Sequence, residues 1–246
     1  MKKIIFALIV LLLGAFVYIK LQALGSPQSG FNQTTRYTLG KHPFYRTIFG
    51  LHKTGDARGE YFGASGGITV EWFKPQSEEV DESVVKSFAS KVSEYTGRPA
   101  QAIYGGAISD GALELSNLPS FQLKSQVQMP AGSVLTVYFA SDFSPRQDAR
   151  MSATYKESGI VLSLKAHRDF ARGFSRYTDQ YMLTSLLREF GTQLGLKDTP
   201  GNSSECIMNR PAGVNGQPPQ AYSGFSPMDF CLSERDRLNQ IRYEYQ

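Results

Sequence analysis

The sequence is poor in the residues that bind metals. Its 246 residues include three histidines and two cysteines, and no two histidines stand one helical turn apart. His42, His52 and His167 also have no cysteine near them in sequence, so each is expected to be a surface or packing residue rather than a metal ligand. There is also no glycine loop followed by Lys-Ser or Lys-Thr, which excludes the usual phosphate-binding loop.

Net charge is also small. The formal charge is +4 and the pI is about 9.0. These values give no indication of a nucleic-acid partner. The hydrophobic fraction of 41% and the aromatic fraction of 12% are sufficient for one substantial globular core.

The N-terminus has the layout of a secretory signal or a signal anchor. Two lysines precede the apolar or small residues Ile4 to Ile19. A helix of this length reaches roughly 24 Å, slightly less than the roughly 30 Å of a membrane's hydrocarbon core. We therefore expect residues 1–24 to be a signal anchor, or a signal peptide cleaved after Gly25, and the rest of the chain to lie outside the cytoplasm, membrane-anchored or secreted.

The two cysteines, Cys206 and Cys231, are expected to form one disulfide, because an exported chain meets an oxidising compartment and no third cysteine is left over. The alternative is a pair of buried free thiols. Residues 25–36 are polar and are expected to be a tether, and residues 37–246 a single domain.

Periodicity predicts alternating strands and helices within that domain. Strands are expected at 66–73, 100–108, 132–141 and 159–167, with a weaker one in "ALELSNL", and an amphipathic helix follows the first strand and ends at Gly97. A second helix, from Thr178 to Leu194, has its apolar residues at helical spacing and stops at Gly195. A final helix is predicted with Ser233 as its cap. The apolar residues of the second helix are Leu183, Leu186, Leu187, Phe190 and Leu194.

The segment "LLREFGTQLGLKDTPGNSSECIMNR", residues 186 to 210, resembles the active-site region of metzincin zinc peptidases, and of archaemetzincin-like members in particular. Their motif, H-E-x-x-H-x-x-G-x-x-H, puts three imidazoles around one zinc ion, with Glu as general base and a methionine turn beyond. In this sequence Glu189 stands at the general-base position. The three histidine positions hold Arg188, Thr192 and Asp198, and Met208 stands at the methionine turn.

The resemblance implies an α/β (α+β) fold with a twisted mixed β-sheet, a motif helix, a long Met-turn loop and a C-terminal helix. It also implies that zinc is absent, because arginine has no lone pair to donate and threonine is a poor ligand. We hypothesise that the Arg188 guanidinium occupies or borders the vacant zinc position. It would pair there with Asp198 or Glu189 while Thr192 fills the remaining space. The alternative is three independent exposed replacements.

These features predict a non-catalytic, metalloprotease-like protein of the cell envelope that binds a peptide or protein through the degenerate cleft. By analogy with metzincins, an extended ligand is expected beside the strand near Gly159 to Lys165. One alternative is a metal-independent hydrolase using Glu189 and Asp198 as an acid-base pair. Another is a structural envelope protein with no ligand in the cleft.

Overall fold

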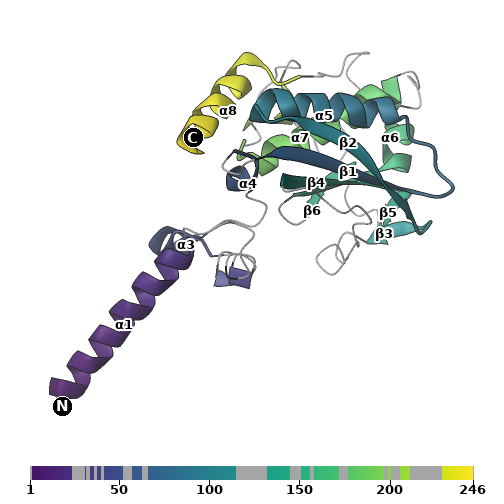
Figure 1. The fold of residues 1–246 in the computed structure, drawn as a ribbon. Coiled ribbons are helices and arrows are strands. Elements are labelled where there is room, and N and C mark those ends of the chain that lie inside the picture. The colour runs from purple at the N-terminus through teal and green to yellow at the C-terminus, as the bar shows by residue number, and fades with distance from the viewer. Residues whose placement is uncertain are drawn as a thin grey trace.

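A computed structural model describes most of the chain. It covers residues 2–23, 31, 34–35, 38–39, 42–51, 57–62, 66–114, 132–144, 151–155, 158–171, 177–196, 199–200, 206–210 and 229–245. The α/β part is a sheet with helices packed on it, and helix α1 projects away from that body (Figure 1). The predicted α/β class is therefore confirmed.

The central sheet has five strands in the order β2-β1-β4-β7-β6. Every neighbouring pair is parallel except β6 with β7, which is antiparallel, so the sheet is mixed as expected. Two small two-stranded sheets, β3 with β5 and β8 with β9, lie beside it. The strands are β1 (Gly67–Pro75), β2 (Ala100–Ile108), β3 (Ala112–Glu114), β4 (Gly132–Ala140), β5 (Asp142–Ser144), β6 (Ser152–Tyr155), β7 (Gly159–Ser163), β8 (Thr199–Pro200) and β9 (Asn209–Arg210).

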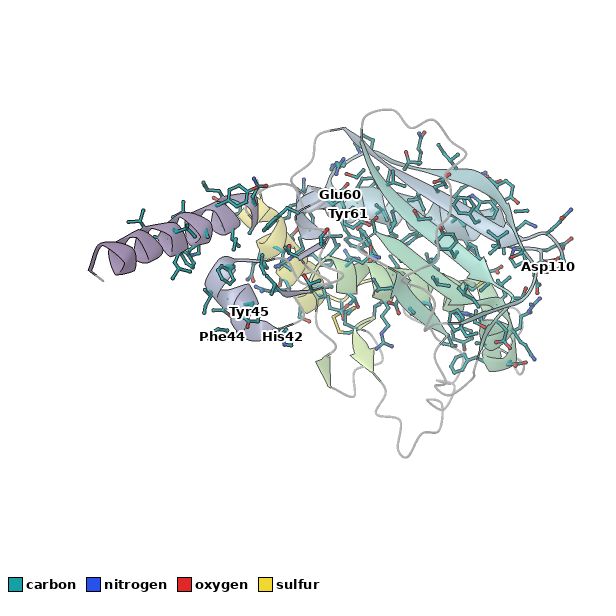
Figure 2. All side chains as sticks on the ribbon, turned by 90° about the horizontal axis from the view of Figure 1, so that it is seen from below. His42, Phe44, Tyr45, Glu60, Tyr61 and Asp110 are labelled. Atoms are coloured by element: carbon teal, nitrogen blue, oxygen red, sulfur yellow. A yellow bond between two sulfur atoms is a disulfide. The ribbon has the colours of Figure 1, made fainter. Side chains whose placement is uncertain are left out.

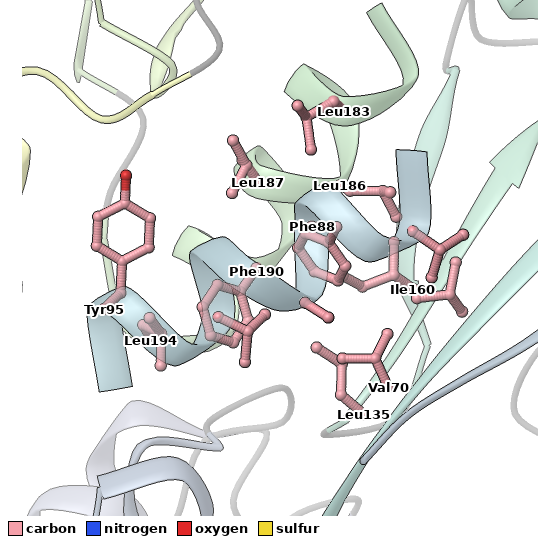
Figure 3. Close-up of a cluster of buried hydrophobic side chains, with 14 of the residues drawn as sticks. Val70, Phe88, Tyr95, Leu135, Ile160, Leu183, Leu186, Leu187, Phe190 and Leu194 are labelled. Atoms are coloured by element: carbon pink, nitrogen blue, oxygen red, sulfur yellow. The ribbon is translucent and has the colours of Figure 1, made fainter. Parts of the chain in front are cut away.

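The two long helices α5 and α7 pack on one face of this sheet, and Figure 3 shows the side chains between them. α5 begins after Asp81, whose side chain caps it by accepting a hydrogen bond from the Ser83 amide, and it ends at Gly97 with φ of 70°. The apolar stripe predicted for α7 is buried along its whole length. The helices are α1 (Lys2–Ala23), α3 (Pro43–Phe49), α4 (Arg58–Phe62), α5 (Glu82–Thr96), α6 (Leu164–Phe170), α7 (Thr178–Gln193) and α8 (Leu232–Tyr245).

The strand expected at 159–167 is shorter than predicted and lies in the interior of the sheet. β7 ends at Ser163, whose hydroxyl accepts a hydrogen bond from the Ala166 amide and so caps α6. All five of its residues are buried, and it lies between β4 and β6. The strand near Gly159 to Lys165, beside which an extended ligand was expected, is therefore not at an edge of the sheet. β6, which was not predicted from the sequence, is one of the two edge strands of this sheet in the described residues.

The N-terminal helix was expected to anchor the chain in a membrane. α1 carries exposed apolar side chains along its described part, including Leu11, Leu12 and Leu13. Among the helices in the described residues, none combines the length and apolar character needed to cross a membrane. The predicted transmembrane helix is therefore not confirmed.

A buried arginine ties the start of the sheet to α4. The Arg98 guanidinium donates to the backbone carbonyls of Glu60 at 2.8 Å, Gly66 at 2.8 Å and Gly67 at 3.0 Å. Glu60 and Tyr61 lie on α4 within the α/β body, where Tyr61 is part of the main core, and Asp110, which follows β2, lies at the opposite end of the molecule from α1 (Figure 2). Arg98 therefore has a structural role.

His167 joins α6 to α7 in the interior. It is fully buried, and its Nδ1 lies 2.8 Å from the Ser163 carbonyl while Nε2 lies 2.8 Å from the Ser185 hydroxyl. A carbonyl only accepts, so Nδ1 carries the proton and Nε2 of the neutral ring accepts from Ser185. Burial lowers the pKa of His167 from 6.5 to about 4, partly offset by its bond to Ser163. His167 is therefore a packing residue.

We expect this histidine to make stability depend on pH. In the unfolded chain the imidazole takes up a proton below its ordinary pKa of 6.5, whereas the folded protein resists protonation until about pH 4. The free energy of unfolding should therefore fall as pH drops from 6.5 to 4, by about 3 kcal/mol in total from this residue. Urea unfolding at several pH values measures the loss.

His167→Asn is the control, since its amide can still donate to the Ser163 carbonyl but does not titrate. The difference in unfolding free energy between the wild type and this variant should shrink as pH falls through the window. A difference that stays constant with pH would show that His167 is not held neutral.

Candidate functional site

Glu189 lies on α7 where the helix crosses the edge strand β6. Its carboxylate oxygen Oε1 accepts a hydrogen bond from the Ser152 hydroxyl at 2.8 Å, and Oε2 accepts one from the Thr154 hydroxyl at 2.7 Å. All three side chains are half-buried. Bonds of this length to an ionised acceptor are among the stronger hydrogen bonds in proteins. The carboxylate thus fastens β6 to α7.

Arg188 and Thr192 lie one turn apart on the same helix. Thr192 is exposed and its hydroxyl donates to the Arg188 carbonyl at 3.1 Å, while the Arg188 side chain is half-buried. Asp198 lies outside the described residues. The hypothesis that Arg188 pairs with Asp198 or Glu189 at a vacant metal position therefore stays a prediction.

These side chains do not fit a zinc site. A guanidinium is always protonated and has no free lone pair, and the Thr192 hydroxyl is turned to its own helix backbone. In the described part of the chain, the side chains close enough to share a metal are Cys206, Cys231 and Glu234. The two sulfurs of that group are joined to each other, so they are not thiolate ligands.

The predicted disulfide between Cys206 and Cys231 is confirmed, with Cα atoms 4.9 Å apart. Beside it, the buried Glu234 carboxylate accepts hydrogen bonds from the amides of Met208 at 2.7 Å, Cys231 at 3.0 Å and Ile207 at 3.2 Å. Glu234 therefore caps α8, which begins earlier than the predicted Ser233 cap, and fixes the turn that carries Met208.

Met208 packs directly beneath α7. It is buried, and a Cβ added at Gly191 would lie 2.9 Å from its sulfur and 3.0 Å from the Phe230 ring. A glycine in the last turn of this helix therefore allows the turn that carries Met208 to approach closely. This contact places Met208 against the helix that carries Glu189, although the sequence reading gave Gly191 no role.

The backbone of β6 has one side without a partner strand in the described residues. The Ser163 amide donates to the Met151 carbonyl at 2.9 Å, so these two residues form a hydrogen-bonded pair. Such pairs alternate along an antiparallel ladder, so Ala153 turns its backbone groups toward β7, whereas Ser152 and Thr154 turn theirs away. The two residues bound by Glu189 thus also direct their amide and carbonyl groups to the open edge.

The sequence reading did not identify Ser152 and Thr154. The sequence pattern of β6 is short, because the strand consists of the four residues "SATY". Its hydroxyl side chains stand two residues apart, which places them on the same face of the strand. Four residues without a strong apolar pattern fall below what periodicity detects. Only the packing of α7 shows that these hydroxyls meet a carboxylate.

No protein-family model matches this sequence, and no curated protein matches it. Two solved structures have a similar fold. Archaemetzincin from Methanopyrus kandleri is 14% identical, with 71% of this chain and 95% of that chain covered and a TM-score of 0.47. A zinc-dependent peptidase from Methanocorpusculum labreanum is also 14% identical, with 70% and 100% covered and a TM-score of 0.45. Likenesses this weak say nothing about activity or metal binding.

The bond between Glu189 and Thr154 should appear as an energetic coupling. If one partner is removed, the other is a half-buried polar group that has lost a charge-assisted hydrogen bond. Glu189→Ala and Thr154→Val should therefore each destabilise the fold. The double variant should lose less than the sum of the two, with a coupling of about 1 to 2 kcal/mol. Chemical denaturation of the four proteins measures it.

Thr192→Val is the matched control, because the Thr192 hydroxyl donates to the Arg188 carbonyl and not to Glu189. Its effect should simply add to that of Glu189→Ala. Additive effects for Thr154→Val as well would mean that the carboxylate does not hold the edge strand.

Proposed function

We propose that this chain is a non-catalytic protein of the cell envelope that binds an extended peptide or protein segment along the open edge of β6. The observation that supports this most directly is the position of Ser152 and Thr154. Their hydroxyls hold Glu189, and their outward backbone groups are the donors and acceptors that an added strand would use. The fold is metalloprotease-like, but its glutamate serves to hold the strand.

Edge strands bind through backbone hydrogen bonds, so affinity depends on keeping the strand extended and still. β6 has only four residues and is joined to the sheet by β7 alone among the described strands. The two bonds from Glu189 fix it from the helix side as well. This preorganisation is the role we assign to the residue at the general-base position.

The chemistry of the neighbouring positions supports a non-catalytic role. Peptide hydrolysis by zinc needs a bound water of lowered pKa, and the side chains of Arg188 and Thr192 supply no ligand to hold such an ion. The Glu189 oxygens are each engaged by a hydroxyl donor. The disulfide supports an oxidising compartment, consistent with the envelope.

Peptide binding can be tested with one pair of variants at Thr154. Thr154→Val and Thr154→Pro both lose the hydroxyl, but only proline also loses the amide that faces the open edge. Because that amide takes no part in pairing with β7, proline is tolerable at this position. In fluorescence polarisation with a library of labelled extended peptides, Thr154→Val should bind the same peptides as the wild type, with a lower affinity because one of the two hydrogen bonds that fix β6 is lost. Thr154→Val is therefore the reference for the proline variant.

Thr154→Pro should weaken binding by about tenfold or more, the equivalent of one lost backbone hydrogen bond plus imperfect strand pairing. Equal binding by both variants, with circular dichroism showing both folded, would place the ligand elsewhere. Absence of binding by the wild type across the library would favour a structural role.

The alternative function, a metal-independent hydrolase that uses Glu189 and Asp198, is tested by assaying turnover and zinc content. We expect no turnover of fluorogenic peptide or glycan libraries by the full chain, and no stoichiometric zinc after equilibration with the metal and dialysis. Turnover that Glu189→Gln abolishes would contradict the proposal and establish a hydrolase. Stoichiometric zinc retained by the wild type would also contradict it.

A further inference from the structure

The other edge strand of the described sheet is β2, which has nine residues where β6 has four. Its sequence, "AQAIYGGAI", contains no charged residue and no proline. Natural proteins usually protect an exposed edge with such residues, because unpaired backbone groups recruit further strands. In the described residues β2 pairs only with β1, so its outer side has no strand beside it.

The ladder shows which backbone groups of β2 face outward. The Ile68 amide donates to the Pro99 carbonyl at 2.8 Å, so Pro99 faces β1. The side to which the backbone amide and carbonyl point alternates from residue to residue along a strand. The backbone groups of Ala100, Ala102 and Tyr104 therefore point away from β1. The regular stretch ends there, because the register shifts by one residue beyond Tyr104.

A shallow groove runs along this edge beside α5. Ala100 and Ala102 line it from the strand, and Lys86, Ser90 and Glu94 line it from the helix. The Lys86 and Glu94 side chains are 63% and 47% exposed, and each lies in a surface ion pair on its own helix, Lys86 with Glu82 at 3.1 Å and Glu94 with Lys91 at 2.9 Å. Exposed pairs of this kind contribute little stability, so both side chains remain accessible to a partner. The groove thus combines open backbone groups with one cation and one anion, placed symmetrically about Ser90.

We propose that this edge pairs with the same edge of a second copy of the chain, forming a twofold dimer with one continuous sheet. In an antiparallel arrangement centred on Ala102, that residue faces its own counterpart, and Ala100 faces Tyr104 of the other copy. Both are outward-facing pairs, so each exchanges two backbone hydrogen bonds. The small alanine leaves room for the large exposed tyrosine.

The charges on α5 favour the same symmetry. A twofold axis beside Ser90 brings Lys86 of one copy to Glu94 of the other, and the reverse pair forms at the opposite end. A groove of one sign would repel its own copy, whereas this one is complementary to itself. This self-complementarity favours a second copy over an unrelated strand as the occupant.

The test is sedimentation of the full chain from about 1 to about 200 µM, since a dimer's population follows mass action. The wild type should reach twice the 27.3 kDa of one chain. Lys86→Glu and Glu94→Lys should each weaken the dimer by about tenfold, because each places like charges in both symmetric pairs. The double reversal should restore affinity to within about threefold.

Ala102→Pro removes the central outward amide without removing a bond to β1, and it should leave the protein monomeric. The three charge variants change exposed side chains only, so they decide the question even if the proline variant fails to fold. A wild type that stays monomeric throughout overturns the proposal. So does a dimer that none of the charge reversals weakens, since it must use another surface.

Discussion

The burial of α7 against the sheet is the constraint on which the rest of the structure depends. Leu186, Leu187, Phe190 and Leu194 are all completely buried, which fixes the rotation of the helix about its axis. With that rotation fixed, Glu189 reaches β6 and Thr192 faces outward. Gly191 then lies over Met208. The local geometry of the site follows from an apolar stripe that contains none of the site residues.

A half-buried carboxylate needs donors, and the fold supplies them from hydroxyls. The hypothesis drawn from sequence was that the charged replacements satisfy one another. For Glu189 the structure shows two strand hydroxyls as hydrogen-bond partners. The two acceptor oxygens of this carboxylate thus hold a strand that has no partner on its other side among the described residues.

Much of the fold could be predicted because its long elements have strong periodic patterns. The stripe of α7, the stop of α5 at Gly97 and the strands β1, β2 and β4 were all predicted from the sequence. β6 and the limit of β7 were not, because strand order and the beginning of α6 depend on contacts between segments distant in sequence. Glu234 was missed for the same reason, since its three amide partners include two from a turn 26 and 27 residues away.

The two edge strands of the described sheet differ in length and in the side chains around them. β6 is short, hydroxyl-bearing and fixed by a carboxylate, whereas β2 is long and uncharged and lies beside a helix whose charges complement themselves. In the described residues each has one side without a partner strand, and β6 is also held by Glu189. The side chains around each edge, rather than the sheet itself, are therefore the basis of the two binding proposals.

The central claim is that Glu189 holds an edge strand ready to receive an extended segment. Residue-resolved amide hydrogen exchange, in the free protein and with a peptide that binds, tests it most directly. The Ser152 and Thr154 amides should exchange quickly in the free protein and become protected on binding, while the Ala153 amide, bonded to β7, changes little. Protection that appears away from β6, with Ser152 and Thr154 unchanged, would contradict it.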